Sequence, residues 1–224
     1  MDFSSGNSGN TIFPTVTKIG PECAQEGAFC QYLGEKIAPK IYSIIPNGYV
    51  MELLQKPDYT DRYLLQKVEK QLRLHIWNRP AIPISTDKTW IQSLEKFGVV
   101  GKSWYAVENS CLVHGDPTLS NTLLRGDQLI IADPRPPRDF VPQSKETDMG
   151  RILQSFFGWE HVAYGWPIVE YYPPEFWYDL TLRKRAEFWA GAAAARIEYQ
   201  ELSRKNSRKN IIDWCNLIRR WTNV

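Results

Sequence analysis

The sequence has little of what marks metal clusters, disulfide frameworks or membrane spans. Its 224 residues include only four cysteines, at positions 23, 30, 111 and 215, and no two of them form a Cys-x-x-Cys pair. This spacing argues against a zinc site or a set of disulfides and suits a reducing compartment. No apolar run approaches the roughly 20 residues of a transmembrane helix, and residues 1–5 lack the pattern of a signal peptide. We therefore expect a cytoplasmic protein with no membrane partner.

A strong bias of charge is also missing. The chain has 27 Lys and Arg against 25 Asp and Glu, which gives a formal net charge of +2. This balance provides no general attraction to nucleic acid, and we expect no nucleic-acid partner. A hydrophobic share of 43%, with nine Trp and eleven Tyr, is typical of a globular protein. The length allows one sizeable core, or two lobes that share a cleft.

The most informative stretch, residues 111–135, places polar side chains on loops beside a predicted hairpin. An apolar lead-in, a polar loop, a short apolar run, a turn, a strand and finally Asp133 follow one another. Phosphoryl transfer needs a carboxylate that accepts a hydroxyl proton, oxygen ligands for Mg²⁺ and a cation on the phosphates. Asp116 is the candidate base, and Asn121 and Asp133 are candidate magnesium ligands.

The order of these residues resembles a known pattern. A His-Gly-Asp motif at residues 114–116, Asn121 and an Asp-Pro pair at residues 133–134 resemble the catalytic and metal-binding loops of the protein-kinase-like superfamily. The variant is similar to the aminoglycoside, choline and sugar phosphotransferase branch. The resemblance implies an α+β, bilobal fold, with a reduced antiparallel-sheet N-lobe over residues 1–55 and a mainly helical C-lobe over 56–224. It also implies transfer of the γ-phosphoryl group of ATP or GTP, with Mg²⁺, to a hydroxyl of a small molecule.

Lys18 and Glu26 are the candidate pair at the nucleotide phosphates. Lys18 lies in an alternating segment that predicts a strand, and residues 22–34 have apolar positions at helical spacing. In the resembling family the strand lysine contacts the phosphates and a helical glutamate orients it. Glu22 is the competing glutamate, and a solvated surface lysine is the alternative for Lys18. The glycine-containing residues 3–14 are either a shortened phosphate-covering loop or a flexible terminus.

The end of the N-lobe supplies the expected adenine contacts. The strand predicted over residues 49–54 resembles the segment that leads into the hinge, so that Met51, Glu52 and Leu53 would line the nucleotide pocket. An ordinary core strand explains the same three residues without a ligand.

Two further residues are expected to support the polar loop. We interpret His114 as structural, with its imidazole holding backbone carbonyls. Asp148, at the start of a predicted helix, matches the family's aspartate that braces the catalytic-loop backbone, although a carboxylate there also suits the helix dipole. The periodicity predicts the C-lobe helices over residues 61–77, 87–97, 174–201 and 209–222.

Basic residues gather near the C-terminus. Residues 183–224 hold ten Lys and Arg against four Asp and Glu, which either guide an anionic partner or form solvated helix faces. The bias argues against a polycationic aminoglycoside. Arg135 and Arg138, in a proline-rich segment at the mouth of the predicted cleft, are either solvated or placed to meet an anionic group. The expected acceptor is anionic or sugar-like.

Two other functions compete. A protein kinase would phosphorylate a polypeptide, but no Ala-Pro-Glu segment follows Asp133, and there is no room for an ordinary activation loop before Asp148. A nucleotide-binding pseudokinase that acts as an interaction module fits the short N-lobe. The presence of Asp116, Asn121 and Asp133 favours an enzyme.

Overall fold

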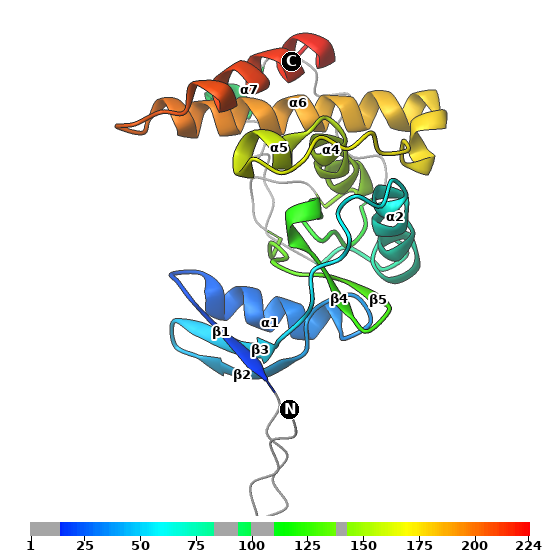
Figure 1. Cartoon of the computed structure of the whole chain (residues 1–224), viewed down its shortest axis with the longest axis vertical. Helices are drawn as coiled ribbons and strands as arrows, with labels where there is room; N and C mark the ends of the chain where they lie inside the picture. Colours follow the sequence, from blue (N-terminus) through cyan, green and yellow to red (C-terminus); the bar gives the residue numbers. More distant parts are fainter. Residues whose placement is uncertain (1–13, 83–93, 100–109, 138–142) are drawn as a thin grey trace, which may run out of the picture.

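The structure is a computed structural model, and it describes residues 14–82, 94–99, 110–137 and 143–224. The glycines of the predicted phosphate-covering loop, Arg138 and most of the helix predicted over 87–97 lie outside these residues. Figure 1 shows a small sheet with one helix at one end of the molecule and a stack of helices at the other. This is the α+β arrangement predicted above, with a reduced antiparallel-sheet lobe and a mainly helical lobe. None of the described helices is both long enough and apolar enough to span a bilayer.

The N-terminal lobe is built on a three-stranded antiparallel sheet. Its strands, rich in β-branched and apolar residues, are β1 (Thr15–Ile19), β2 (Ile41–Ile45) and β3 (Gly48–Glu52), in the order β1-β3-β2. Helix α1 (Cys23–Leu33) packs on this sheet. A Cβ added at Gly27 of α1 would lie 2.8 Å from the side chain of Tyr49 in β3, so glycine permits this close approach. The packing brings Glu26 of α1 next to Lys18 of β1.

After β3 the chain joins a hairpin of the C-terminal lobe. The Gln55 N–H donates to the Leu124 carbonyl at 3.0 Å, and the Leu124 N–H donates to the Gln55 carbonyl at 2.8 Å. Leu124 belongs to β4 (Thr122–Arg125), which pairs with β5 (Gln128–Ile131). Arg125 binds the Glu52 carboxylate and donates to the Glu35 carbonyl at 2.6 Å. Main-chain and charged contacts thus hold the sheet and the hairpin together.

Helices form most of the remaining chain. They are α2 (Leu64–His75), α4 (Lys145–Phe156), α5 (Trp159–Tyr164), α6 (Leu180–Leu202) and α7 (Lys209–Thr222), with short 3₁₀ turns η2 (Leu119–Asn121) and η3 (Glu175–Tyr178). The main core gathers buried apolar residues of α1, α2, α4, α6 and the hairpin. Helix α5, which the sequence did not predict, is a short segment between Gly158 and Gly165, both with left-handed backbones.

Helices α4 and α6 touch at a glycine. A Cβ added at Gly150 of α4 would lie 2.6 Å from Trp189 Cβ and 2.9 Å from the backbone nitrogen of Ala190, both in α6. A side chain there would therefore push the helices apart. Because Gly150 has none, α6 lies close enough to α4 to form one wall of the cavity described next.

Candidate functional site

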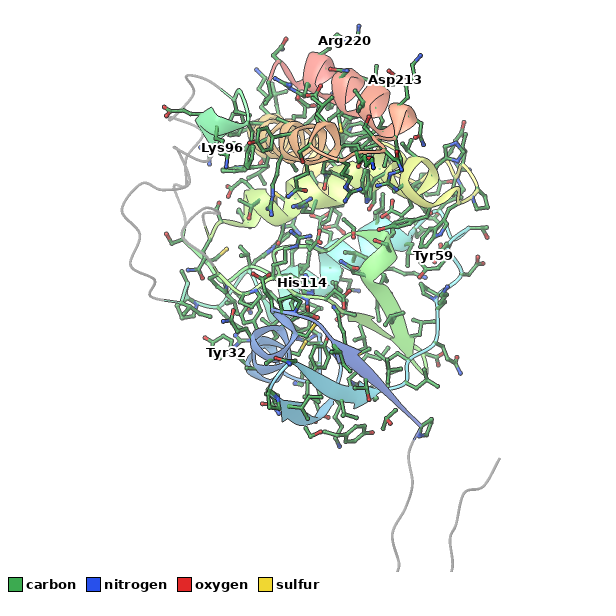
Figure 2. The ribbon with its side chains drawn as sticks, turned by 90° about the vertical axis from the view of Figure 1, so that its left-hand side faces the viewer. Tyr32, Tyr59, Lys96, His114, Asp213 and Arg220 are labelled. Atoms are coloured by element: carbon green, nitrogen blue, oxygen red, sulfur yellow. The ribbon has the colours of Figure 1, made fainter. Side chains whose placement is uncertain are left out.

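The polar loop, residues 114–121, rests on the buried ring of His114, which lies in the interior between the N-terminal lobe and the helices (Figure 2). Its Nε2 lies 3.1 Å from the Ile131 carbonyl oxygen, and because a carbonyl only accepts, Nε2 carries the hydrogen. The Asp116 N–H approaches Nδ1 at 3.4 Å. Burial lowers the pKa of His114 to about 4, so the ring is neutral at physiological pH. The imidazole connects the loop to strand β5.

Asp148 of α4 fixes the same loop from the other side. Its carboxylate is fully buried and accepts hydrogen bonds from the N–H groups of His114 at 2.9 Å and Gly115 at 2.7 Å, and from Trp77 Nε1 at 3.0 Å. Burial raises the pKa of Asp148 to about 6, while these hydrogen bonds favour the charged form. The backbone that carries Asp116 is therefore attached to α4 at two consecutive residues.

Two arginines surround the Asp116 carboxylate. Arg135 donates to Oδ2 through Nε at 3.0 Å and Nη2 at 2.9 Å, and Arg151 Nε lies 3.7 Å from Oδ1. Burial alone would raise the pKa of Asp116, but the charges of Arg151 and Arg135 more than offset it, so that the pKa lies below its usual value. The Asp116 carboxylate is consequently ionised over the neutral pH range.

Lys18 connects the two lobes at the site. Its Nζ lies 2.7 Å from Glu26 Oε1 and 2.8 Å from Asp133 Oδ1, and Tyr49 donates its hydroxyl hydrogen to the same Glu26 oxygen. Burial opposes the charge of Lys18, but its bonds to Asp133 and Glu26 raise its pKa above the usual value. The predicted lysine, glutamate and aspartate thus come together in space from a strand, a helix and a loop.

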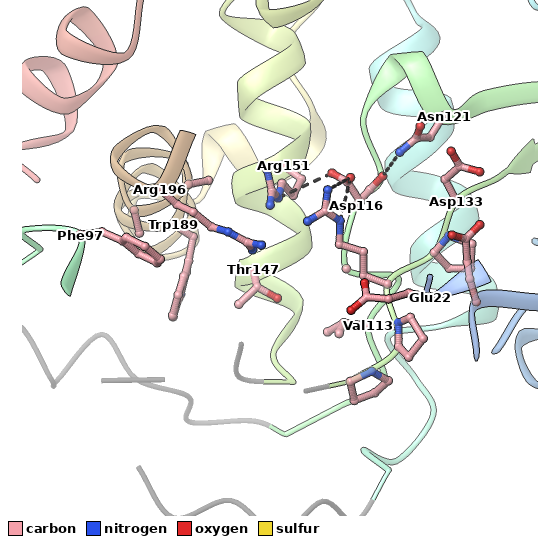
Figure 3. A pocket seen from close by; sticks show the side chains of 18 of the residues that line it. Glu22, Phe97, Val113, Asp116, Asn121, Asp133, Thr147, Arg151, Trp189 and Arg196 are labelled. Atoms are coloured by element: carbon pink, nitrogen blue, oxygen red, sulfur yellow. Dashed lines mark hydrogen bonds and ion pairs between the residues drawn. The ribbon is translucent and has the colours of Figure 1, made fainter. Parts of the chain in front are cut away.

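Asp133 and Asn121 lie near each other at the edge of the cavity (Figure 3). Asp133 follows β5 with a left-handed backbone, φ 55°, a strained conformation for a residue other than glycine. Asn121 donates from Nδ2 to the Asp116 carbonyl at 2.8 Å, which fixes the orientation of its amide. Among the described residues no group of three or more His, Cys, Asp or Glu is placed to hold a metal. Mg²⁺ at phosphates takes only one or two protein carboxylates, completed by phosphate and water oxygens, so Asp133 with the Asn121 amide oxygen fits it.

These residues line a cavity of about 490 Å³ between the lobes. The predicted site residues that line it are Lys18, Glu26, Asp116, Asn121 and Asp133, and the competing Glu22 lines it as well. Thr147, Arg151, Trp189 and Arg196 lie on its other side, along α4 and α6 (Figure 3).

The three predicted adenine contacts are not among the lining residues. The Glu52 carboxylate binds Arg125 and accepts from the Lys40 N–H. The N–H groups of Glu52 and Leu53 donate to the carbonyls of Lys40 and Pro14, at 3.0 and 3.1 Å. Their role, with that of Met51, stays a prediction.

Among the residues that line the cavity from α4 and α6, Arg151, Trp189 and Arg196 are polar or aromatic side chains that the sequence analysis did not place in the site. Arg151 comes one helical turn after Asp148 in α4, and that spacing was its available signal. Trp189 and Arg196 lie in a helix whose apolar and basic residues form no clear stripe, so only the packing of α6 on α4 shows which of them face the cavity.

No protein-family model and no curated protein matches the sequence. A solved structure does resemble the fold: an ethanolamine kinase of Plasmodium vivax, with a TM-score of 0.57 and 13% sequence identity, over 94% of this chain and 75% of that chain. At this identity the similarity shows the kinase-like fold, not the reaction or its substrate.

Proposed function

We propose that the protein transfers the γ-phosphoryl group of ATP or GTP to a hydroxyl of a small molecule. The observation that carries the proposal is the meeting of Lys18, Glu26 and Asp133 at one side of a cavity that also holds the Asp116 carboxylate. A positioned base, a phosphate-binding cation and oxygen ligands for Mg²⁺ are what phosphoryl transfer requires. The kinase-like fold agrees with this assignment.

Each residue has a separate task in this reaction. The acceptor hydroxyl oxygen forms a bond to the γ-phosphorus as the bond from that phosphorus to the bridging oxygen breaks, and the nucleoside diphosphate leaves. Asp116 takes the hydroxyl proton, and Arg135 keeps this carboxylate ionised and oriented. Lys18 binds phosphate oxygens while Glu26 holds its ammonium group in place. Asn121 and Asp133 would hold Mg²⁺, which neutralises charge on the phosphates when bound.

The same proposal gives the two lobes different roles, nucleotide binding in the N-terminal lobe and acceptor binding in the C-terminal lobe. Residues 1–55 cover the nucleotide with Lys18 and Glu26, and residues 56–224 carry the polar loop and the acceptor side. The pairing of Gln55 with Leu124 supports a division at this point, since the chain enters the C-terminal hairpin there.

Equilibrium binding of Mg-nucleotide tests the metal and phosphate assignments. We expect the parent protein to bind Mg–ATP or Mg–GTP, and Asp133→Asn to lose most of the magnesium-dependent part of the affinity. Asp213→Asn, which removes an exposed carboxylate of α7, is the matched control and should bind like the parent. Equal binding by Asp133→Asn and the parent would refute the metal assignment.

A further inference from the structure

Arg135 lies beside the proposed base with part of its guanidinium group unused. Its Nε and Nη2 both donate to Asp116 Oδ2, at 3.0 and 2.9 Å, and its side chain is 49% exposed and lines the cavity. Among the described residues, Nη1 of Arg135 has no hydrogen-bond partner. Arg151, the other arginine at Asp116, is only 16% exposed and donates from Nη1 to Gln154 Oε1 at 2.8 Å. Arg135 is therefore the arginine beside Asp116 that can bind a further group in the cavity.

The backbone of Arg135 is held between the proposed metal site and the polar loop. Arg135 follows Asp133 by two residues, and its N–H donates to the His114 carbonyl at 2.8 Å. A Cβ added at Gly115, whose φ is +87°, would lie 2.9 Å from Arg135 Cβ, so glycine allows the two segments to approach this closely. The side chain of Arg135 thus starts where the segment with Asp133 meets the loop with Asp116.

The geometry of phosphoryl transfer brings the γ-phosphoryl group near this guanidinium. Asp133 lies on one side of Asp116 and the helices α4 and α6 on the other (Figure 3). With Mg²⁺ and the phosphates toward Asp133, the acceptor hydroxyl approaches Asp116 from the α4–α6 side. A hydroxyl hydrogen-bonded to Asp116 lies about 2.7 Å from its oxygen, and the attacked phosphorus lies about 3–3.5 Å from the hydroxyl oxygen. The phosphorus is then no more than about 6 Å from the carboxylate that Arg135 contacts, which places the phosphoryl oxygens within reach of Nη1.

The charge on Asp116 changes during the reaction, and this change favours a contact between Arg135 and the phosphoryl group. Before transfer, the ionised carboxylate is the partner of the guanidinium. As Asp116 takes the hydroxyl proton, its attraction for Arg135 falls, while negative charge is spread over the three equatorial oxygens of the transferring group. A guanidinium beside both groups therefore binds the transition state more strongly than the ground state, which accelerates the chemical step.

Resting on the phosphotransferase function proposed above, we infer that Arg135 is a catalytic residue that binds the γ-phosphoryl group during its transfer. The acceptor oxygen bonds to the γ-phosphorus as the bond from this phosphorus to the bridging oxygen breaks, the hydroxyl proton moves to Asp116, and the nucleoside diphosphate leaves. Arg135 donates from Nη1 to an equatorial oxygen of the transferring group and stabilises its negative charge. This role goes beyond holding Asp116, because Arg135 itself touches the reacting group.

Binding of a transition-state mimic tests the inference. The probe is Mg–ADP, or Mg–GDP if the parent prefers guanine, with and without aluminium fluoride, which takes the place of the transferring phosphoryl group. The measured quantity is the fluoride gain, the ratio of the dissociation constants without and with aluminium fluoride. We expect Arg135→Gln to keep the parent affinity for the diphosphate alone and to lose about 10- to 100-fold of the fluoride gain, the usual weight of a hydrogen bond to a charged group. Arg135→Lys keeps the charge but not the planar fork, so its fluoride gain should lie between those of Arg135→Gln and the parent.

A double-variant cycle separates contact with the phosphoryl group from an effect through Asp116. Asp116→Asn removes the charge that Arg135 binds, and Arg135→Gln is then added in that background. A residue that only orients the carboxylate has no further effect once the carboxylate is gone, whereas a residue that touches the phosphoryl group still has one. We expect a loss of about 10-fold or more of the fluoride gain in both backgrounds. Arg220→Gln, which removes an exposed arginine of α7 outside the cavity lining, is the matched control and should behave like the parent.

The outcomes distinguish this inference from the function on which it rests. A smaller fluoride gain for Arg135→Gln in both backgrounds, with unchanged affinity for the diphosphate, supports the inference and shows that the variant is folded. A parent-like fluoride gain, a loss seen only when the Asp116 carboxylate is present, or an equal loss of affinity for the diphosphate alone would overturn it. A parent protein that binds no nucleotide, or that shows no fluoride gain, would instead refute the phosphotransferase proposal and the role of Arg135 with it.

Discussion

Gly150→Ala should separate α4 from α6 and damage the acceptor side of the cavity. The added Cβ would stand 2.6 Å from Trp189 Cβ and 2.8 Å from the Trp189 carbonyl carbon. Carbon atoms pack at about 3.5–4.0 Å, so the helices must move apart by roughly 1 Å. Backbone atoms cannot rotate out of the way, in contrast to the end of a flexible side chain. The displacement is therefore passed on to Trp189 and to Arg196 further along α6.

Two opposing terms set the effect of Gly150→Ala on stability. Alanine in a helix interior gains about 1 kcal/mol over glycine, whereas overpacking a tight interface costs about 1–3 kcal/mol. Since the clash involves the backbone, we expect the upper end of that cost and a net destabilisation of about 1–2 kcal/mol. For a chain of this size each kcal/mol lowers Tm by about 2–4 °C. Thermal unfolding of the variant should thus occur about 2–8 °C below that of the parent.

The effect of Gly150→Ala on acceptor kinetics should be larger than its effect on stability, and Gly27→Ala is the variant for comparison. This variant makes the same exchange in α1, where the Cβ would strike the Tyr49 side chain beside Glu26. We expect Gly150→Ala to reduce kcat/KM for the acceptor, up to about 100-fold for a displacement near 1 Å, and to leave nucleotide affinity nearly unchanged. Gly27→Ala should mainly weaken nucleotide binding. An unchanged Tm together with an unchanged acceptor kcat/KM in Gly150→Ala would refute this account of the wall.

Two further predictions concern charged contacts. Asp116 has a depressed pKa, so its ionisation stabilises the fold above the pKa of the unfolded state, and this stability is lost as pH falls through the folded-state pKa. Arg135→Gln should raise the folded-state pKa of Asp116 and move the acid limb of the pH–rate profile for ATP hydrolysis to higher pH. An acid limb at the same pH in the variant and the parent would contradict this. Arg125→Gln removes the charged partner of Glu52, which keeps only its bond from the Lys40 N–H, and should cost about 2–3 kcal/mol in chemical denaturation. The Arg125→Gln, Glu52→Gln double variant should recover part of this loss. Equal stability of the parent and Arg125→Gln would show that the contact contributes nothing.

Much of the fold was predictable because its signals are local. The alternating segment around Lys18 forms β1, and the apolar stripe beginning at Leu64 forms α2. The predicted helix over 209–222 corresponds to α7 with the same bounds. The single long helix expected over 174–201 is divided instead, because Asp179 caps a new helix by accepting from the N–H groups of Thr181 and Leu182 after the turn η3.

The sequence indicated the polar-loop side of the candidate site but not the side formed by α4 and α6. Asp116, Asn121 and Asp133 occur within one short stretch, in an order that resembles the catalytic and metal-binding loops of the protein-kinase-like superfamily. The side of the cavity formed by α4 and α6 depends on packing between segments about forty residues apart. Gly150 permits this packing because it has no side chain, and its importance can be recognised only when both helices have been placed. Arg196 therefore looked like one more basic residue on a terminal helix.

The most direct test of the central proposal is the rate of ATP or GTP hydrolysis by the parent protein beside Asp116→Asn, with Asp213→Asn as control. Asparagine keeps the shape of the side chain but cannot take the proton, so the proposal predicts unchanged Mg-nucleotide binding and a loss of turnover of about 100-fold or more. The control should turn over like the parent. Equal hydrolysis by Asp116→Asn and the parent would contradict the role of Asp116 as base. A parent protein that binds nucleotide but never turns it over would contradict the phosphotransferase itself and leave a nucleotide-binding interaction module.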